Sequence, residues 1–418
     1  MEILIKDGLV FNGEGFLKQD VLCEGGIIKE VGVGIKKKTE YVINAENLIV
    51  SPGFVDLHVH LRQPGFEQKE TISSGTAAAV AGGFTTICAM PNLNPTPDCK
   101  KNLEIEKKII KEDAKCRVLP FMSITLNREG KKVVTPVNGC VGISDDGNSV
   151  QDEKIMKMAM KVASEKNVLL SAHCEDKNFT PENWCVNKGE YSKRTGLKAV
   201  SNASEYEELK RDLYLLKKNK CKYHVCHVST KESVELIREA KRQNLSATCE
   251  VTPHHLILCE DDLKDDGCFK MSPPLRTKKD KEALINAITD GTIDAIATDH
   301  APHTENEKSK GLKGSAMGVV GLECAFSVLY ESLVTTCKLS IDKLLNLMSF
   351  YPAKIININC GIKPFFNADM VIIDLKKSLI VDPDKFFSKG RSTPFKDKKV
   401  KGKIVATIFD GRVVYKNF

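Results

Sequence analysis

Histidine is scarce in this sequence, and most of its nine histidines stand in short polar motifs that follow apolar runs. The first motif, at positions 56–65, reads Asp-Leu-His-Val-His-Leu-Arg-Gln-Pro-Gly and contains His58 and His60. This motif overlaps the end of an apolar run at 53–61, and a short apolar run is typical of a buried β-strand. Because side chains alternate along a strand, His58 and His60 should project from the same face and could bind one metal ion.

Two carboxylates follow later apolar runs in the same way. In Gly-Ile-Ser-Asp-Asp-Gly, at positions 142–147, alternation favours Asp146 over Asp145 as the carboxylate that faces inward. In the last run, Asp299 alternates in phase with the small and apolar residues before it. Both carboxylates are therefore expected at the rim of a sheet.

Two more histidines come from runs between these carboxylates. His173 follows a run that ends in Ser-Ala. In the segment at positions 224–230, alternation places His224 and His227 on opposite sides of a strand. We expect His227, in phase with Val225 and nearer the strand's end, to face inward, and His224 to pack against a helix.

Together these residues make a set of nitrogen and oxygen ligands that suits Zn²⁺, namely His58, His60, Asp146, His173, His227 and Asp299. Any one of them alone is more often a core or surface residue, but five strand ends contributing together favour a shared site. Two zinc ions beside two carboxylates would leave the site cationic, lower the pKa of bound water and attract an anionic substrate. Hydrolysis of an amide, or its reverse, is the chemistry that this set predicts. Because six ligands already complete a two-metal set, we expect the neighbouring pair His254 and His255 either to have a structural role or to support the ligands without binding metal.

A second group of polar residues favours recognition of a substrate carboxylate. Arg62 follows His60 by two residues, and a guanidinium at a metal rim can bind a carboxylate through two hydrogen bonds. Asn92 and His303 lie in similar positions. For Asn92, a turn or capping role is an equally open interpretation.

The elements that must position these residues alternate between apolar runs and helix-like segments. Eight runs, the number that a closed (β/α) barrel needs, lie at 53–61, 85–90, 117–125, 139–144, 168–172, 223–228, 247–251 and 293–298. The helix-like segments lie at 102–111, 153–166, 205–218, 231–244, 279–290 and 321–336. This alternation predicts an α/β fold with a TIM-type barrel over residues 53–360, whose site is built at the carboxyl ends of the strands.

Both ends of the chain are strand-like, and we expect residues 1–52 and 361–418 to form one small composite β-sandwich domain. Two loops, at 177–201 and 302–318, carry no clear helical or strand pattern. Long loops of this kind are often functional lids. For the first loop, a surface excursion without a role is an equally open interpretation.

The composition excludes several classes of protein. The chain has 418 residues and a net charge of +7 that is spread along it, so we expect no nucleic-acid partner. No apolar stretch approaches the roughly 18 residues of a membrane span, and no signal pattern is present, so we expect a cytoplasmic protein without membrane contact. Fifteen cysteines without a Cys-x-x-Cys pair argue against a disulfide framework and a zinc ribbon.

The motifs, in this order, resemble the amidohydrolase superfamily and, within it, the dihydroorotases of the bacterial and archaeal long-chain type. The resemblance covers essentially the whole chain and rests on seven motifs, at 56–65, 90–92, 144–147, 172–175, 227–230, 252–255 and 297–303. It implies a distorted (β/α)₈ barrel with a composite β-sandwich. It also implies hydrolysis of a cyclic amide, in the reversible conversion of N-carbamoyl-L-aspartate to L-dihydroorotate in pyrimidine biosynthesis.

The resemblance further implies roles for the metal ligands. His58 and His60 would hold one zinc ion and His173 and His227 the other, with Asp146 as the bridging carboxylate. Many relatives bridge their metals with a carbamylated lysine. This chain has no lysine at the end of the fourth run, which argues against the dihydropyrimidinase and allantoinase branches.

Catalysis and substrate binding follow from the same resemblance. Asp299 would bind metal and act as general acid and base, passing the proton of a metal-activated hydroxide to the departing nitrogen. The substrate would be contacted by His60, Arg62, Asn92, Ser272, His303, Met317 and Gly318. Ser272 stands where the subfamily often has asparagine, and its shorter reach predicts somewhat weaker binding.

Two alternatives stay open. A hydrolase for another cyclic ureide, such as a hydantoin or allantoin, could use the same metals, but a neutral hydantoin offers no carboxylate to Arg62. An inactive paralogue could serve only as an assembly partner for aspartate carbamoyltransferase, although all six ligand positions are filled. A homo-oligomer, or a complex with that transferase, is also compatible with an active enzyme.

Overall fold

Eight parallel strands form a barrel in which neighbours follow the order of the chain. The computed structural model describes residues 2–418. The barrel strands are β6 (Phe54–Val59), β7 (Phe84–Ala89), β8 (Arg117–Met122), β9 (Gly142–Ile143), β10 (Leu169–Ala172), β13 (Lys222–Val225), β14 (Ala247–Val251) and β15 (Ala295–Ile296). The ring closes where the amide of His60 donates to the carbonyl of His300 at 2.9 Å. Each predicted apolar run overlaps one of these strands, so the barrel prediction is confirmed.

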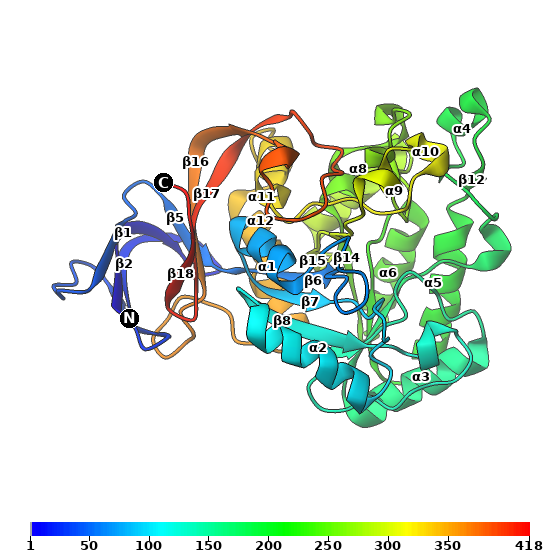
Figure 1. Ribbon diagram of the computed structural model, residues 1–418, viewed down its shortest axis with the longest axis horizontal. Helices are drawn as coiled ribbons and strands as arrows, with labels where there is room; N and C mark the ends of the chain where they lie inside the picture. Colours follow the sequence, from blue (N-terminus) through cyan, green and yellow to red (C-terminus); the bar gives the residue numbers. More distant parts are fainter. Residues whose placement is uncertain (1) are drawn as a thin grey trace.

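Helices cover the outside of the barrel (Figure 1). The longer ones are α1 (Ile72–Ala81), α2 (Lys100–Asp113), α3 (Glu153–Lys166), α5 (Ala203–Leu216), α6 (Lys231–Arg242), α8 (Lys278–Asp290) and α12 (Ile341–Met348). Shorter ones are α4 (Glu190–Thr195), α7 (Pro253–Ile257), α9 (Glu305–Lys308), α10 (Gly311–Gly314), α11 (Ala325–Leu329) and α13 (Phe350–Ile355). Five of the predicted helices match α2, α3, α5, α6 and α8 within a few residues.

Two helical regions differ from the prediction. Helix α1 was not predicted, because its Ser-Ser-Gly-Thr-Ala-Ala-Ala-Val sequence is small and mostly buried and so shows no amphipathic stripe. The predicted helix at 321–336 begins only at Ala325 and widens into a π-helical turn over Tyr330–Val334.

The second large sheet combines strands from both ends of the chain. The first five are β1 (Glu2–Phe11), β2 (Phe16–Glu24), β3 (Ile27–Gly32), β4 (Tyr41–Asn44) and β5 (Ile49–Pro52). The last three are β16 (Met370–Ile380), β17 (Lys399–Phe409) and β18 (Arg412–Lys416). Antiparallel pairing of β5 with β16 joins the two groups into one sheet, which lies beside the barrel in Figure 1.

This composite β domain was predicted, and it has an apolar core of its own, which includes Ile3, Val21, Met370 and Ile408. It is also tied to the barrel, because the hydroxyl of Thr407 donates to the carbonyl of Val80 at 2.6 Å. The domain limits at 52/53 and 360/361 stay predictions.

Two further expectations concern the described residues as a whole. No helix within residues 2–418 combines the length and the hydrophobicity needed to cross a membrane. The fifteen cysteines are all free, and most of them are buried.

Candidate metal and substrate site

A cavity of about 350 Å³ opens at the carboxyl ends of the barrel strands. Its walls are formed by His60, Arg62, Asn92, Asp146, Gly147, His173, Glu175, Trp184, His227, Ser272, Asp299, Ala301, His303, Met317 and Gly318. Every residue that the sequence predicts to bind metal or substrate belongs to this set, except His58. The His58 side chain is fully buried, and its ring contacts the same Asp146 carboxylate.

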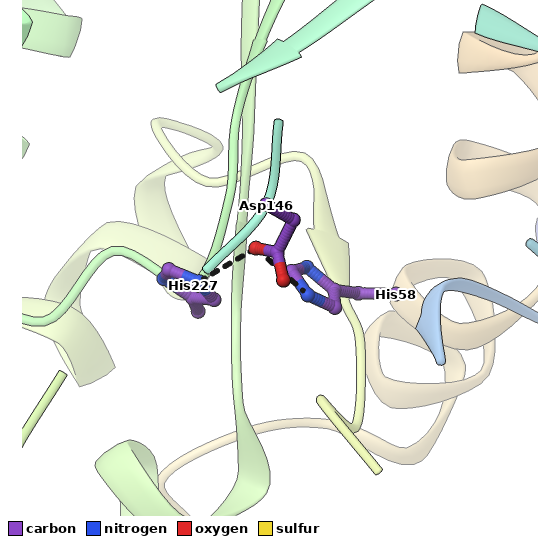
Figure 2. A group of neighbouring side chains, drawn as sticks. All are labelled: His58, Asp146 and His227. Atoms are coloured by element: carbon purple, nitrogen blue, oxygen red, sulfur yellow. Dashed lines mark ion pairs between the residues drawn. The ribbon is translucent and has the colours of Figure 1, made fainter. Parts of the chain in front are cut away.

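Asp146 lies at the centre of four histidines that come from three different strand ends. Its Oδ1 is 3.3 Å from His58 Nε2, and its Oδ2 is 3.4 Å from His60 Nε2. On the other side, Oδ1 is 3.6 Å from His173 Nδ1 and 3.6 Å from His227 Nε2. Figure 2 shows Asp146 between His58 and His227. One carboxylate thus faces two separate pairs of imidazoles.

Asp299 supplies the second carboxylate of the cluster. Its Oδ1 is 3.2 Å from His60 Nε2 and 3.6 Å from His58 Nε2. Nitrogen and oxygen ligands about 2.1 Å from one tetrahedral ion stand about 3.4 Å apart, so these separations suit a shared metal. Two overlapping groups of the cluster could therefore each hold a metal ion. One consists of His58, His60 and Asp299, and the other consists of His58, Asp146 and His227.

Two buried atoms of the cluster make no hydrogen bond within residues 2–418. They are Nε2 of His58 and Oδ1 of Asp146. A buried polar atom without a partner costs about 1–3 kcal/mol, and each of these atoms faces the other ligands. A cation between them would satisfy both atoms, so the residues present fit a metal site.

Hydrogen bonds at the outer ring nitrogens fix three of these histidines. In each ring the outer N–H donates to an oxygen, which leaves the inner nitrogen bare for a metal. The pairs are His58 Nδ1 with Glu250 at 2.9 Å, His60 Nδ1 with Asn92 at 2.7 Å, and His173 Nε2 with Glu175 at 3.2 Å.

The electrostatics of the cluster keep its carboxylates ionised. Burial alone would raise the pKa of Asp146, but the imidazoles of His58, His173 and His227 outweigh burial and hold this pKa well below its usual range. Burial likewise opposes ionisation of Asp299, and the neighbouring His60 and His58 lower its pKa. Both groups can therefore act as metal ligands, and Asp299 can accept a proton.

Three residues of the site adopt left-handed backbone conformations, which non-glycine residues rarely do. The φ angle is 61° at Arg62, 32° at His227 and 47° at Asp299. Such strain persists only where the surrounding structure enforces it, and it clusters at functional sites. Each of these residues lies just beyond the end of a barrel strand.

His224 is the one histidine whose predicted surroundings are wrong. It does not face a helix, because its ring bonds Thr248 at 2.9 Å and Glu250 at 3.1 Å on the neighbouring strand β14. His227 does reach the cluster, but not through strand alternation. Strand β13 ends at Val225, and the turned backbone at His227 then directs the ring inward.

Arg62 gives one side of the cavity its positive charge, and His303 lies beside it. Burial lowers the pKa of Arg62 to about 10, so the guanidinium is charged at neutral pH. Burial and the cations Arg62 and Lys69 lower the pKa of His303 to about 3, so its ring is neutral. Lys69 Nζ lies 3.3 Å from His303 Nδ1. On the other side of the ring, His303 Nε2 donates to the Met317 carbonyl at 2.7 Å.

Sequence reasoning missed several residues of the site. Glu175 comes two residues after His173 within a motif that was recognised, so its position offered a signal. Trp184, the only tryptophan, comes from the unassigned loop at 177–201, and nothing in the sequence placed it in the cavity. Glu175 also accepts a hydrogen bond at 3.2 Å from the hydroxyl of Ser272, which was predicted as a substrate contact.

Comparison with known proteins identifies the family. A family model described as Dihydro-orotase-like matches residues 47–233. The dihydroorotase of Bacillus cereus (strain AH820) is 44% identical over 422 aligned positions, which cover 99% of this chain and 98% of that protein. The chain belongs to the dihydroorotase family. The dihydroorotase of Bacillus thuringiensis (strain Al Hakam) shows the same identity and coverage.

Solved structures support the fold of this dihydroorotase family member. The L-hydantoinase (dihydropyrimidinase) from Arthrobacter aurescens superposes with a TM-score of 0.88 at 23% identity, covering 99% of this chain and 96% of that one. The dihydropyrimidinase from Brevibacillus agri NCHU1002 gives 0.87 at 20% identity, over 100% of this chain and 95% of that one. At these identities the likeness concerns the barrel and the composite β domain.

Proposed function

We propose that this protein is a zinc-dependent dihydroorotase that interconverts N-carbamoyl-L-aspartate and L-dihydroorotate in pyrimidine biosynthesis. The observation that carries the proposal is the partly buried, charged Arg62 at the rim of a His and Asp cluster. This arrangement offers a carboxylate site beside a site for amide hydrolysis. The 44% identity with curated dihydroorotases over nearly the whole chain supports the same reaction.

Two zinc ions fit the ligand set. His58 and His60 with Asp299 would hold one, His173 and His227 the other, and Asp146 faces both pairs. When bound, zinc would supply polarisation of the ring carbonyl and activation of a water molecule for attack.

The substrate carboxylate would bind between Arg62, Asn92 and His303. Asn92 accepts a hydrogen bond from His60 through Oδ1, which leaves its NH₂ group free to donate to the substrate. The neutral His303 donates its Nε2 proton to the Met317 carbonyl, so its ring would line this site without donating to the carboxylate. The guanidinium of Arg62 adds two parallel donors and the compensating charge.

Asp299 would move the proton in this reaction. Its carboxylate is ionised and lies at the cavity surface. In hydrolysis it would take the proton of the attacking water and deliver it to the ring nitrogen as the amide bond breaks. In ring closure the same group would work in the opposite direction.

The role of Arg62 can be tested with substrates that differ in their carboxylate. We expect wild-type protein to hydrolyse L-dihydroorotate, which has a carboxylate, and to leave hydantoin and allantoin essentially unchanged. Arg62→Met should reduce kcat/KM for L-dihydroorotate by about 100-fold or more, because the paired, charged hydrogen bonds to the substrate carboxylate are lost. Equal kcat/KM in the variant, or preferential turnover of a neutral ureide by the wild type, would reject the proposed substrate.

Assembly and location are part of the same proposal. All six ligands and the substrate contacts come from one chain, so we expect turnover without aspartate carbamoyltransferase. Gel filtration of the purified chain, with and without that transferase, would reveal a homo-oligomer or a complex. The cytoplasmic location stays a prediction.

A further inference from the structure

Lys308 is a buried lysine that no metal or substrate role accounts for. It ends α9 within the loop at 302–318, and only 7% of the residue is exposed. Its Nζ donates to three backbone carbonyls, those of Lys270 at 3.0 Å, Ala316 at 2.8 Å and Gly318 at 2.7 Å. Within residues 2–418 no carboxylate forms an ion pair with it.

These three carbonyls belong to the two chain segments that carry the cavity-wall residues Ser272, Met317 and Gly318. Ala316 and Gly318 flank Met317, and Lys270 lies two residues before Ser272. The backbone reinforces the connection, because the amide of Gly318 donates to the Lys270 carbonyl at 3.0 Å. The Lys308 ammonium therefore links the two segments at one point.

The segment at 316–318 is held in one conformation by contacts to His303 and Ala301. The Met317 carbonyl accepts the Nε2 proton of His303, while Gly318 has a φ of 132°. A Cβ at Gly318 would lie 2.7 Å from the Ala301 carbonyl oxygen, so the backbone approaches too closely for a side chain. Small movements of 316–318 would displace both His303 and the cavity wall.

A space-filling role does not explain the ammonium. Burial lowers the pKa of Lys308 to about 7, since the carbonyl oxygens replace only part of the lost hydration. A methionine would fill the same volume without this desolvation cost. The three directed donors of an ammonium, in contrast, match the three carbonyls that have to be held together.

We propose that Lys308 is a positioning residue of the site, whose ammonium holds the carbonyls of Lys270, Ala316 and Gly318 so that Met317 and Gly318 form a fixed wall. The loop at 302–318 is then a preformed part of the cavity and not a lid that opens in each turnover. The role in catalysis rests on the proposed function, whereas the fixed wall does not.

Hydrogen exchange of the substrate-free wild-type protein tests the fixed wall directly. We expect the amide of Gly318 to exchange at least about 100-fold more slowly than the exposed amides of the same loop. Exchange of Gly318 at the rate of those exposed amides would overturn the proposal. This measurement needs neither a variant nor enzymatic activity, so it remains decisive if turnover of L-dihydroorotate is not found.

Kinetics then test the effect on the substrate. In Lys308→Met we expect KM for L-dihydroorotate to rise about 10-fold or more while kcat stays within about 3-fold, because the wall contacts the substrate before and during reaction. Lys313→Met is the matched control, since Lys313 lies exposed in the same loop and should keep wild-type constants. An unchanged KM in Lys308→Met, or a lower melting temperature as its only defect, would contradict positioning.

A rescue experiment separates loss of the ammonium from general disruption. Lys308→Ala leaves space for a small alkylamine, so added n-propylammonium should lower its KM at least about 3-fold, whereas n-propanol should not. Rescue by both compounds alike would show that filled volume matters and would overturn the role of the ammonium.

Discussion

At the scale of single residues, the cluster depends on groups that hold the ligands. Glu250 illustrates this, because its two oxygens bond His58 at 2.9 Å and His224 at 3.1 Å. Burial would raise the pKa of Glu250, but these two histidines lower it to about 2, so it is a carboxylate at neutral pH. The hydrogen bond from His58 Nδ1 to Glu250 fixes the orientation of the His58 ring, so that its Nε2 faces Asp146.

Replacing Glu250 should therefore weaken metal binding. We expect Glu250→Ala to bind zinc about 10- to 100-fold more weakly, as is typical when the hydrogen-bond partner of a ligating histidine is removed. Glu250→Gln keeps an acceptor oxygen and is the control that should lose less. Competition with a chromogenic chelator measures both affinities, and equal affinity in wild type and Glu250→Ala would contradict this role.

The residues that gather in the cluster were predictable from sequence, but their supporting partners were not. His58, His60, Asp146, His173, His227 and Asp299 each follow an apolar run and carry an obvious donor atom. Glu250 looks like an ordinary strand residue, because its partner His58 lies 192 positions away in the chain. Pairings at such distances depend on the closure of the barrel, which a local pattern does not contain.

At the scale of elements, the loops after the strands decide where the ligands point. The turn after β13 is fixed by Glu205 of α5, which accepts hydrogen bonds from the backbone amides of Ser229 and Thr230. Arg276 lies beside it, with Nη2 3.9 Å from Glu205 Oε2, and both side chains are buried. This buried pair supports the turned backbone that carries His227.

Removing one member of this pair should be costly. We expect Glu205→Ala to lower the free energy of unfolding by about 3–5 kcal/mol, because Arg276 is left as an uncompensated buried charge. Urea unfolding measures this loss. Glu207→Ala, on a more exposed part of the same helix, should change the value by no more than about 0.5 kcal/mol. Similar small losses in both variants would show that the pair does not stabilise the turn.

Sequence patterns predicted the elements better than the turns. Helix α3 was expected at its observed bounds, because an apolar stripe runs along it. In the structure Asp152 caps its first turn. Strand alternation predicted the wrong surroundings for His224. It does not explain His227 either, which reaches the cluster as predicted although the strand ends two residues before it. The left-handed residues Arg62, His227 and Asp299 carry no local signal, because none of them is a glycine.

At the scale of the whole molecule, the segment before β17 folds back over the barrel. The hydroxyl of Ser388 donates to Glu70 at 2.5 Å, and its amide donates to Glu323 at 3.1 Å. The Val320 amide donates to the Ser392 carbonyl at 2.9 Å. The composite β domain and the rim of the site are thus parts of one connected structure.

Glu323, which accepts the hydrogen bond from Ser388 in these contacts, should make the free energy of unfolding depend on pH. Burial raises the pKa of Glu323 to about 7, against about 4.3 in an unfolded chain. Between these two pH values the folded protein holds a proton on Glu323 that the unfolded chain has released. The stability that protonated Glu323 contributes to the folded state is therefore complete below about pH 4.3 and is lost as the pH rises through about 7.

Glu323→Gln removes this titration. We expect the stability of Glu323→Gln relative to wild type to increase by about 1 kcal/mol between pH 5 and pH 8, a conservative conversion of the shift for a partly exposed group. Urea unfolding of both proteins at the two pH values gives the difference and cancels the titration of the metal ligands. A difference that does not vary with pH would contradict the raised pKa.

The central claim is that the His and Asp cluster holds the metal on which dihydroorotase activity depends. The most direct measurement follows hydrolysis of L-dihydroorotate by the purified protein, together with its zinc content, before and after chelation and again after zinc is restored. The account predicts about two zinc ions per chain, loss of turnover on chelation and its return with zinc. Undiminished turnover in the metal-free protein would contradict it.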